Sequence, residues 1–199
     1  MIVVVTPYER LTQTHIDKLL DIETYIDGVI LRTPTEQDML VNWIETLLRA
    51  GFPKSKVIVH TDVTLAERMG IQQLHFREGD MTAFALKAQK PSYQVSMSAH
   101  SVESIVTARD RQLDFGVYGH LFMSASKPGQ APRTKDAIQQ ALSQHWPLVA
   151  IGGIDVASVK EVAPQFSGIA CIQSAFATST STFKEMVQHW QQLKKERMP

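Results

Sequence analysis

Residues 147–176 read PLVAIGGIDVASVKEVAPQFSGIACIQSAF and hold two short apolar runs separated by a more polar segment. Pro147 to Ile151 and Gly168 to Gln173 have the length and composition of buried strands, and a helix is expected between them from near Asp155. A strand, a helix and a second strand in this order form a βαβ unit, whose two strands run parallel. This stretch therefore predicts a parallel sheet with helices packed against it.

The same alternation runs through the rest of the chain. Six earlier strand candidates are Ile2 to Thr6, Gly28 to Arg32, Lys56 to His60, Gln72 to Phe76, Tyr93 to Met97 and Asp114 to Gly119. The expected helices begin near Thr14, Thr35, Val63, Met81, Ser101, Thr134 and Asp155, and a last one runs from about Thr182 to Glu196.

Eight such units of roughly 25 residues each are typical of a closed barrel. We therefore predict an α/β fold, a (β/α)8 TIM barrel with a closed parallel sheet, formed as a single domain by residues 1–199. An open doubly wound sheet is the alternative, but it usually has fewer strands at this length and a glycine-rich first turn. The first turn here is Thr6-Pro7-Tyr8-Glu9, which lacks the GxGxxG pattern.

Charge and cysteine content narrow the class of protein. Lys and Arg total 20 and Asp and Glu total 20, so no bulk field favours a nucleic acid or an anionic membrane surface, and an anion must be bound locally. The single cysteine, Cys171, excludes an intrachain disulfide and is expected to be a buried thiol. No targeting segment or spanning stretch is recognisable, so we expect a cytoplasmic protein; a homodimer is compatible with the sequence.

In a closed parallel barrel the active site lies at the carboxyl ends of the strands. The residues at these ends are unusually polar: Thr6, Arg32, His60-Thr61-Asp62, His75 with Arg77 and Asp80, Ser96-Met97-Ser98 with His100, His120, Gly152-Gly153 and Ser174-Ala175. Each taken alone is an ordinary strand end in contact with water. Together they supply groups suited to one site that binds an anion and moves a proton.

Small residues follow the last two strand candidates. Gly152 and Gly153 come after the seventh, and Ser174 and Ala175 come after the eighth. Glycine lets backbone amides approach an anion closely, and the loops after strands seven and eight of such barrels recurrently bind phosphate. We therefore expect these four residues to bind a phosphate group. A tight turn that requires positive φ is the alternative reason for the glycines.

His120 follows the sixth strand candidate and opens the long connection from Gly119 to Arg133. Imidazole can accept and return a proton near neutral pH, so we expect His120 to be a catalytic acid and base, with a hydrogen-bonded structural histidine as the alternative. Arg32 suits a planar carboxylate, and Lys127 in the connection suits a phosphate or another substrate charge.

Nothing in the sequence requires a metal ion or another cofactor. The spacing of His60, His75 and His100 resembles no zinc site. Asp62 and Asp80 could offer oxygen ligands to Mg²⁺, but two carboxylates on successive strands are equally a solvated rim. We therefore predict a site without a metal and without a cofactor.

Over nearly its whole length the sequence resembles the thiamine phosphate synthase superfamily, and within it the thiazole tautomerases. The motifs that carry the resemblance are Val4-Val5-Thr6, Ile30-Leu31-Arg32, residues 70–75 (GIQQLH), residues 95–101 (VSMSAHS), residues 114–127, residues 149–154 (VAIGGI), Gly168-Ile169-Ala170 and Ser174-Ala175-Phe176. At strand six the synthases typically have Gly-Pro-hydrophobic-Phe, whereas the tautomerases have Gly-His-hydrophobic-Phe. This chain has Gly119-His120-Leu121-Phe122, which favours the tautomerases.

Two departures from the family patterns are visible. Synthases hold Mg²⁺ and pyrophosphate with a Gln before the strand-two Arg, an Asn-Asp pair after strand three and an Asp after strand four. In those places this chain has Ile30, Thr61-Asp62 and Asp80, so the set is incomplete. The tautomerase loop usually ends in Gly-Arg-Gly, while residues 129–134 here read GQAPRT.

The resemblance implies an isomerase of thiamine biosynthesis that aromatises a small phosphorylated thiazole carboxylate. It implies that His120 moves the proton and that Gly152, Gly153, Ser174 and Ala175 bind the phosphate. Arg32 and Ser98 would contact the carboxylate or the ring. Two other functions stay open: a Mg²⁺-dependent thiamine phosphate synthase, and a catalytically silent phosphate-binding protein with a regulatory role.

Overall fold

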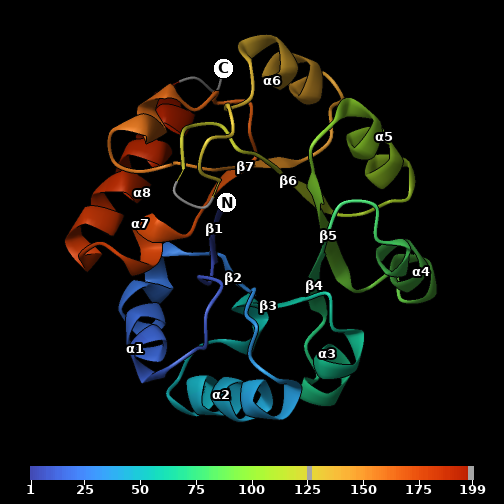
Figure 1. Cartoon of the computed structure of the whole chain (residues 1–199), viewed down its shortest axis with the longest axis vertical. Helices are drawn as coiled ribbons and strands as arrows, with labels where there is room; N and C mark the ends of the chain where they lie inside the picture. Colours follow the sequence, from blue (N-terminus) through green and yellow to red (C-terminus); the bar gives the residue numbers. More distant parts are fainter. Residues whose placement is uncertain (125–126, 197–199) are drawn as a thin grey trace.

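The computed structural model describes residues 1–124 and 127–196 and confirms the closed barrel (Figure 1). Each strand pairs in parallel with the next along the chain, and the last pairs with the first. The strands are β1 (Ile2–Val5), β2 (Gly28–Leu31), β3 (Val57–His60), β4 (Gln73–Phe76), β5 (Gln94–Ala99), β6 (Phe115–Gly119), β7 (Leu148–Ile151) and β8 (Gly168–Cys171).

Helices surround the barrel as an outer ring (Figure 1). They are α1 (Gln13–Ile22), α2 (Gln37–Arg49), α3 (Val63–Met69), α4 (Met81–Gln89), α5 (Val102–Asp110), α6 (Lys135–Leu142), α7 (Gln173–Phe176) and α8 (Thr180–Glu196), with 3-10 turns η1 (Glu23–Tyr25), η2 (Lys54–Lys56) and η3 (Ser158–Glu161). Five of the described helices begin at a side chain that accepts a hydrogen bond from a first-turn amide, which satisfies donors that the helix leaves free. These capping residues are Asp62, Asp80, Ser101, Thr134 and Ser179.

The strands are buried on both faces because alternate residues serve two separate cores. Along β1, Val3 and Val5 belong to the cluster inside the barrel, whereas Ile2 and Val4 belong to the cluster between the sheet and the helices. The inner cluster also contains Ile30, Ile58, Phe115, Val117, Val149 and Ala170. This double burial explains why the strand segments are nearly continuous apolar runs rather than alternating ones.

The prediction of a helix from Asp155 is wrong, because the structure has only the 3-10 turn η3 there. Asp155 Oδ1 accepts hydrogen bonds from the amides of Ala157 and Ser158, which forms a turn, and Pro164 disfavours helical geometry in the residue before it. The expected eighth strand was also too long. Ile172 has helical dihedrals and α7 begins at Gln173, so the pairing of β8 ends at Cys171.

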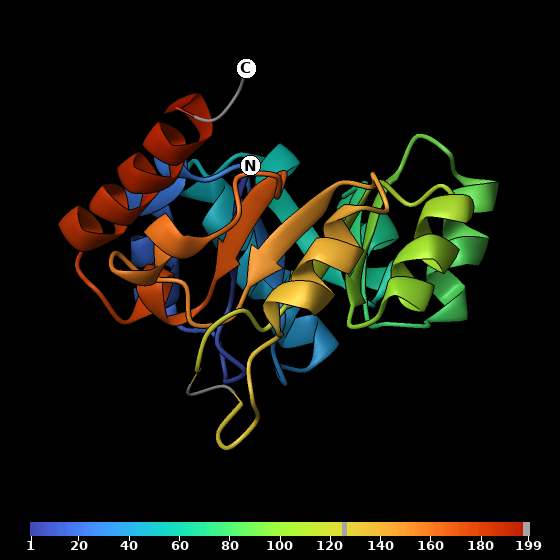
Figure 2. The same ribbon diagram turned by 90° about the horizontal axis from the view of Figure 1, so that it is seen from above.

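One face of the barrel collects the carboxyl ends of the strands. The described parts of the 119–133 connection lie on this face, and the N-terminus lies at the opposite end (Figure 2). No helix among the described residues is long and apolar enough to span a membrane.

Gly119 sets the close approach of β6 and β7 at this face. A Cβ added there would overlap the carbonyl oxygen of Ile151 and lie 2.8 Å from Ile151 Cγ2. We expect Gly119→Ala to lower the free energy of unfolding by about 1–3 kcal/mol, the usual cost of overpacking a tight contact. Urea unfolding of the wild type and the variant at neutral pH measures this difference in free energy.

Gly129→Ala is the matched control, because a Cβ at Gly129 would meet nothing within 4 Å and introduces only the strain of a φ of +74°. A Gly119→Ala protein that is no less stable than this control would contradict the assigned contact.

Candidate active site

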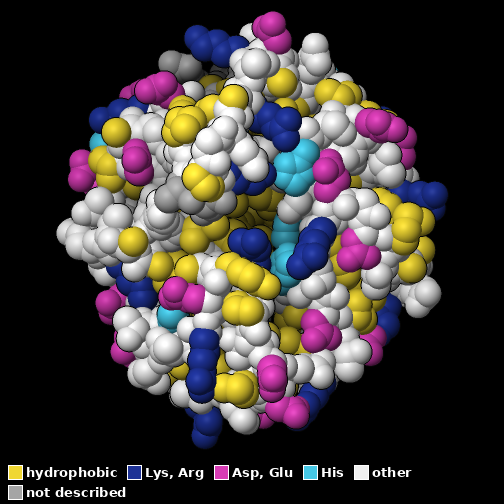
Figure 3. Space-filling model, viewed as in Figure 1, with side chains coloured by type: hydrophobic (Ala, Val, Ile, Leu, Met, Phe, Trp, Pro, Cys, Tyr) yellow, Lys and Arg dark blue, Asp and Glu magenta, His cyan; other side chains and the backbone are white. Residues whose placement is uncertain are grey.

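A cavity of about 440 Å³ opens at the carboxyl ends of the strands. Seen from this face, a hollow at the centre of the molecule has an apolar floor and a wall that carries cationic and histidine side chains (Figure 3). The floor consists of inner-barrel residues such as Val5, Ile30 and Val117. The site predicted from the strand ends is therefore one continuous cavity.

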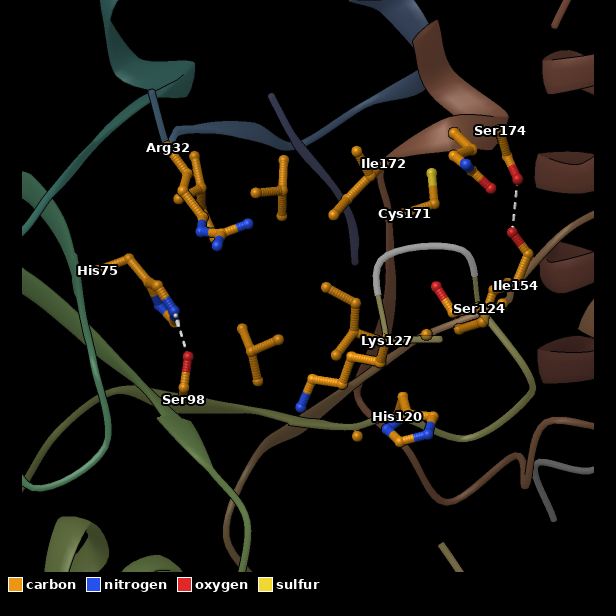
Figure 4. Close-up of a pocket in the computed structure, with 18 of the residues that line it drawn as sticks. Arg32, His75, Ser98, His120, Ser124, Lys127, Ile154, Cys171, Ile172 and Ser174 are labelled. Atoms are coloured by element: carbon orange, nitrogen blue, oxygen red, sulfur yellow. Dashed lines mark hydrogen bonds between the residues drawn. The ribbon is translucent and has the colours of Figure 1, made fainter. Parts of the chain in front are cut away.

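The side chains around the cavity fall into two groups (Figure 4). Arg32, His75 and Ser98 lie on the side formed by β2, β4 and β5, while His120 and Lys127 lie across from them on the connection after β6. Of the eight residues predicted for the site, seven line the cavity: Arg32, Ser98, His120, Lys127, Gly152, Gly153 and Ser174.

His120 is buried, with 7% of its surface exposed. Its Nε2 lies 3.1 Å from the carbonyl oxygen of Gln130. A carbonyl can only accept a hydrogen bond, so Nε2 carries the hydrogen and donates it. Nδ1 is then the ring nitrogen that can take up and release a proton, which leaves His120 chemically able to serve as an acid and a base.

The connection after β6 is fastened at both ends. The Arg133 backbone amide donates to the His120 carbonyl at 3.0 Å, and Arg133 Nε donates to the Gly119 carbonyl at 3.1 Å. These bonds bring residue 133 back to the point where the connection begins. Residues 125 and 126 of the connection lie outside the described part of the chain.

Gly152 and Gly153 allow the connection to pass close to β7. Both have positive φ, and an added Cβ would overlap His120 Cβ at Gly152 and the Met123 carbonyl oxygen at Gly153. The Phe122 amide donates to the Gly152 carbonyl at 2.9 Å. Both glycines are therefore required by backbone conformation and packing, and both also line the cavity.

The residues after β8 divide between the cavity and the core. Ser174 lines the cavity, but its hydroxyl donates to the Ile154 carbonyl at 2.5 Å and so ties the β8 end to the β7 loop. The structure does not bring Ala175 to the cavity, because its side chain is fully buried and its amide donates to the Ile172 carbonyl at 3.1 Å. Gln173, the first residue of α7, lines the cavity in its place.

Positive charge dominates the cavity wall. Arg32, Arg77 and Lys127 all line it, and the single acidic lining residue among the described residues is the exposed Asp155. The same field acts on His60, because burial first, and then Arg77 and Arg32, lower the pKa of its imidazole to about 4. The chain as a whole is neutral, so the fold concentrates cations at this site.

His75 lies between two serines on β5. Its Nδ1 is 2.9 Å from Ser96 Oγ and its Nε2 is 3.0 Å from Ser98 Oγ, while Ser96 Oγ donates to the Leu74 carbonyl at 3.2 Å. Burial is the largest influence on the ring and lowers its pKa to about 3. His75 is therefore neutral at physiological pH.

A second histidine at the rim has a carboxylate partner. His100 Nδ1 lies 2.9 Å from Glu78 Oε2, and the His100 amide donates to Glu78 Oε1 at 2.7 Å. The hydrogen bonds from Ser104 and His100 hold the pKa of Glu78 below its ordinary value, against the opposing effect of burial. His100 lines the cavity, so this pair places an oriented imidazole at its edge.

Asp62 and Asp80 are helix caps rather than cavity residues. Asp62 accepts from the Leu65 amide at 2.8 Å and from Gln37 Nε2 at 3.0 Å, and Asp80 accepts from the Thr82 amide at 2.9 Å. These bonds give both carboxylates a structural role at the amino ends of α3 and α4.

Several residues that line the cavity or support its rim were left out of the predicted site. Arg77 follows β4 directly, so its position was already visible in the strand pattern. Gln173 and Glu78 carried no such signal, because the first was expected within a strand and the second acts only through His100. Cys171 is buried as expected, and burial raises the pKa of its thiol to about 12, but it also lines the cavity.

Comparison with known proteins identifies relatives of this chain. A family model described as thiamine monophosphate synthase matches residues 2–175. The thiamine-phosphate synthase of Lysinibacillus sphaericus is 34% identical over 101 residues, which cover 49% of this chain and 47% of that protein. The thiamine-phosphate synthase of Geobacillus kaustophilus is 28% identical over 151 residues, covering 73% of this chain and 66% of that protein. The chain thus spans between about half and two thirds of the length of these relatives.

Solved structures share the fold at low sequence identity. The thiamine phosphate pyrophosphorylase from Pyrococcus furiosus superposes with a TM-score of 0.76 at 17% identity, covering 100% of this chain and 96% of that one. A 3-hexulose-6-phosphate synthase superposes with a TM-score of 0.70 at 15% identity, covering 94% of this chain and 98% of that one. At these identities the likeness extends to the barrel and no further.

The buried, neutral His75 should make stability depend on pH. Its pKa is about 3 in the folded protein, whereas the unfolded chain takes up the proton near the ordinary value of 6.5. Between these values the unfolded state binds more protons, so the free energy of unfolding falls as the pH falls. From pH 7.5 to pH 5 we expect His75 to account for a loss of about 2 kcal/mol.

Urea unfolding at pH 7.5 and pH 5 tests this for the wild type and for His75→Gln, which cannot titrate. The exposed His145 provides the control His145→Gln, which should keep the wild-type pH dependence. The same pH dependence in the His75→Gln protein as in the wild type would show that His75 does not cause it.

Proposed function

The chain belongs to the thiamine monophosphate synthase family, and within that family we propose that it is a thiazole tautomerase. The proposed substrate is the phosphorylated thiazole carboxylate tautomer in which an exocyclic double bond keeps the ring from being aromatic. The observation that carries the proposal is His120. It lines the cavity with Nε2 bonded to the Gln130 carbonyl, which leaves Nδ1 for proton transfer.

The reaction needs one proton to move and no other reactant. His120 Nδ1 takes the proton from the ring carbon that bears the carboxylate, and the electron pair of that carbon–hydrogen bond shifts into the ring. The exocyclic double bond moves into the ring, and the exocyclic carbon receives a proton from His120. Both ring and histidine end with the same number of protons as they began, and the ring is aromatic.

The charges of the cavity suit the two anionic groups of this substrate. We assign the phosphate to the loops after β7 and β8, through Gly152, Gly153 and Ser174, with Gln173 beside them. Ser174 supplies backbone there, because its hydroxyl is already bonded to Ile154. The carboxylate is assigned to Arg32, and the Lys127 side chain extends into the cavity beside His120 (Figure 4).

Catalysis then consists of orienting the substrate and moving the proton. The wall would bind the phosphate on one side and the carboxylate on the other, and so hold the ring between them. This lowers the entropy cost of reaching the reacting geometry. A general acid and base of this kind contributes typically about 10²- to 10⁴-fold. The gain in aromatic stability drives the reaction forward.

Thiamine phosphate synthase is the second candidate, and the names of the curated relatives favour it. That reaction requires Mg²⁺ to hold a pyrophosphate, so the cavity must offer oxygen ligands to a cation. The carboxylates of Asp62 and Asp80 instead cap α3 and α4, and the wall is lined by Arg32, Arg77 and Lys127. These residues do not fit a Mg²⁺ site, and for that reason we rank the synthase second.

His120→Gln is the variant that tests the proposed base. The Gln amide can still donate to the Gln130 carbonyl as Nε2 does, but it offers nothing in place of Nδ1. We expect single-turnover aromatisation of the thiazole tautomer to slow by about 10²- to 10⁴-fold. Affinity for the aromatic product, measured by calorimetry, should stay within about twofold of the wild type.

The three candidate functions give different results in the same assay. Equal rates for the wild type and His120→Gln would remove His120 as the base. Carbon–nitrogen bond formation with a pyrimidine pyrophosphate by the wild type would establish the synthase. A wild type that accelerates neither reaction over buffer would be a silent phosphate-binding protein.

Gln173→Glu tests the phosphate position. A carboxylate at this point of the wall should repel the substrate phosphate and raise the dissociation constant of the aromatic product by about 10-fold or more. Gln173→Met is the matched control, because it removes the amide without adding charge and should change the constant by less than about threefold. Equal affinities in the Glu and Met variants would place the phosphate elsewhere.

A further inference from the structure

A continuous chain of hydrogen bonds runs from the β4 backbone to the cavity. It passes from the Leu74 carbonyl to Ser96 Oγ, from Ser96 Oγ to His75 Nδ1, and from His75 Nε2 to Ser98 Oγ, over distances of 3.2, 2.9 and 3.0 Å. His75 and Ser96 are buried, with 4% and 1% of their surface exposed. His75 and Ser98 both line the cavity, and Ser98 is the less buried of the two (Figure 4).

The Leu74 carbonyl fixes the direction of this chain. A carbonyl has no hydrogen to give, so the Ser96 hydroxyl donates to it and offers a lone pair to His75. Nδ1 of His75 must then carry the ring hydrogen. Nε2 is left as an acceptor, and the Ser98 hydroxyl donates to it.

The other protonation states of His75 satisfy fewer of these hydrogen bonds or place a charge in the core. With the hydrogen on Nε2, the Ser96 hydroxyl would have to turn toward Nδ1, and its bond to Leu74 would be lost. A doubly protonated ring would carry a charge in a fully buried place beside His60, whose ring centroid is 6.0 Å away. Burial and His60 both lower the pKa of His75, which keeps the ring neutral.

We propose that Ser96 and His75 are positioning residues that fix Ser98 as a hydrogen-bond acceptor facing the cavity. The one hydrogen of the Ser98 hydroxyl is given to His75, so only lone pairs of Ser98 face a ligand. Such a group accepts from an N–H or O–H donor or faces a polarised C–H edge, and it repels a carboxylate. Ser98 is therefore a specificity determinant on the side of the cavity opposite His120.

For the proposed reaction this inference decides the orientation of the substrate. The carboxylate cannot rest against Ser98, so it lies toward Arg32, and the reacting carbon–hydrogen bond of the ring faces His120 on the opposite side. This last step rests on the proposed function. The direction of the hydrogen-bond chain does not, because it follows from protein atoms alone.

NMR of protein labelled with ¹⁵N-histidine tests the direction of the chain. In the wild type, His75 should show a hydrogen-bearing Nδ1 and a bare Nε2, and His75→Gln identifies its signals by their loss. Ser96→Ala removes the acceptor of Nδ1–H and should shift the ring toward the Nε2–H tautomer. Ser98→Ala, the control, should keep the wild-type tautomer. An Nε2–H tautomer in the wild type, or no change in Ser96→Ala, would overturn the proposal.

Two replacements of His75 separate hydrogen-bond direction from packing. The amide of His75→Gln can donate to Ser96 and accept from Ser98, whereas His75→Phe fills the space and does neither. We expect kcat for aromatisation to stay within about threefold in the Gln variant and to fall about 10-fold or more in the Phe variant, with KM unchanged. Equal kcat values, or a raised KM in the Phe variant alone, would overturn the role of Ser98.

The two proposals fail in different ways. A wild type that aromatises nothing, but whose His75 carries its hydrogen on Nδ1, would remove the tautomerase and leave Ser98 as a fixed acceptor. A wild type that aromatises the tautomer, but whose His75 carries its hydrogen on Nε2, would leave the tautomerase and remove the positioning role.

Discussion

The close approach of the 119–123 segment to the end of β7 holds the candidate active site together. Leu121 and Phe122 donate backbone hydrogen bonds to Ile151 and Gly152, so the segment continues the pairing of β6 with β7 beyond the end of the strand. Glycine at 119, 152 and 153 leaves the space for this, since a Cβ at each would overlap the neighbouring chain. Because His120 lies within this segment, its position in the cavity depends on that packing. The glycines that sequence reasoning connected with phosphate thus first serve to place the proposed base.

The two sides of the cavity differ in how their polar groups are supported. On the β4–β5 side, His75 and Ser96 are buried and bonded to one another and to the strand backbone, which makes Ser98 a group of fixed direction. On the β6 side, His120 lies in the connection, and its imidazole donates a hydrogen bond to the Gln130 carbonyl. The rigid wall can orient the ring of the proposed substrate, and the facing His120 has a ring nitrogen that can change its protonation. A proton transfer needs both functions. The buried neutral His75 costs stability under acidic conditions, which is a common consequence of placing a polar group in a core.

Electrostatics explains how a chain without net charge can form a cavity suited to the proposed substrate, which has two anionic groups. Acidic side chains near the strand ends have other hydrogen-bond partners: Asp62 and Asp80 cap helices, and Glu78 is bonded to His100. Arg32, Arg77 and Lys127 remain around the cavity and have little competition from carboxylates there. The surroundings are partly apolar, so these charges are screened less than they would be on an open surface. The distribution of charge, rather than its total, therefore decides what the cavity can hold.

The sequence by itself determined the barrel, because double burial of parallel strands leaves a direct mark in eight apolar runs with regular spacing. It also determined that residues ending these runs share one face, which brought seven of the eight predicted site residues to the cavity. Tertiary structure alone decided the rest. Whether Asp155 starts a helix, whether Ala175 faces the cavity or the core, and whether Asp62 serves a ligand or a helix depend on short contacts between distant segments, and no local pattern encodes them. The direction of the Ser96–His75–Ser98 chain is of the same kind, since it is set by a carbonyl on the neighbouring strand that only the barrel brings within reach.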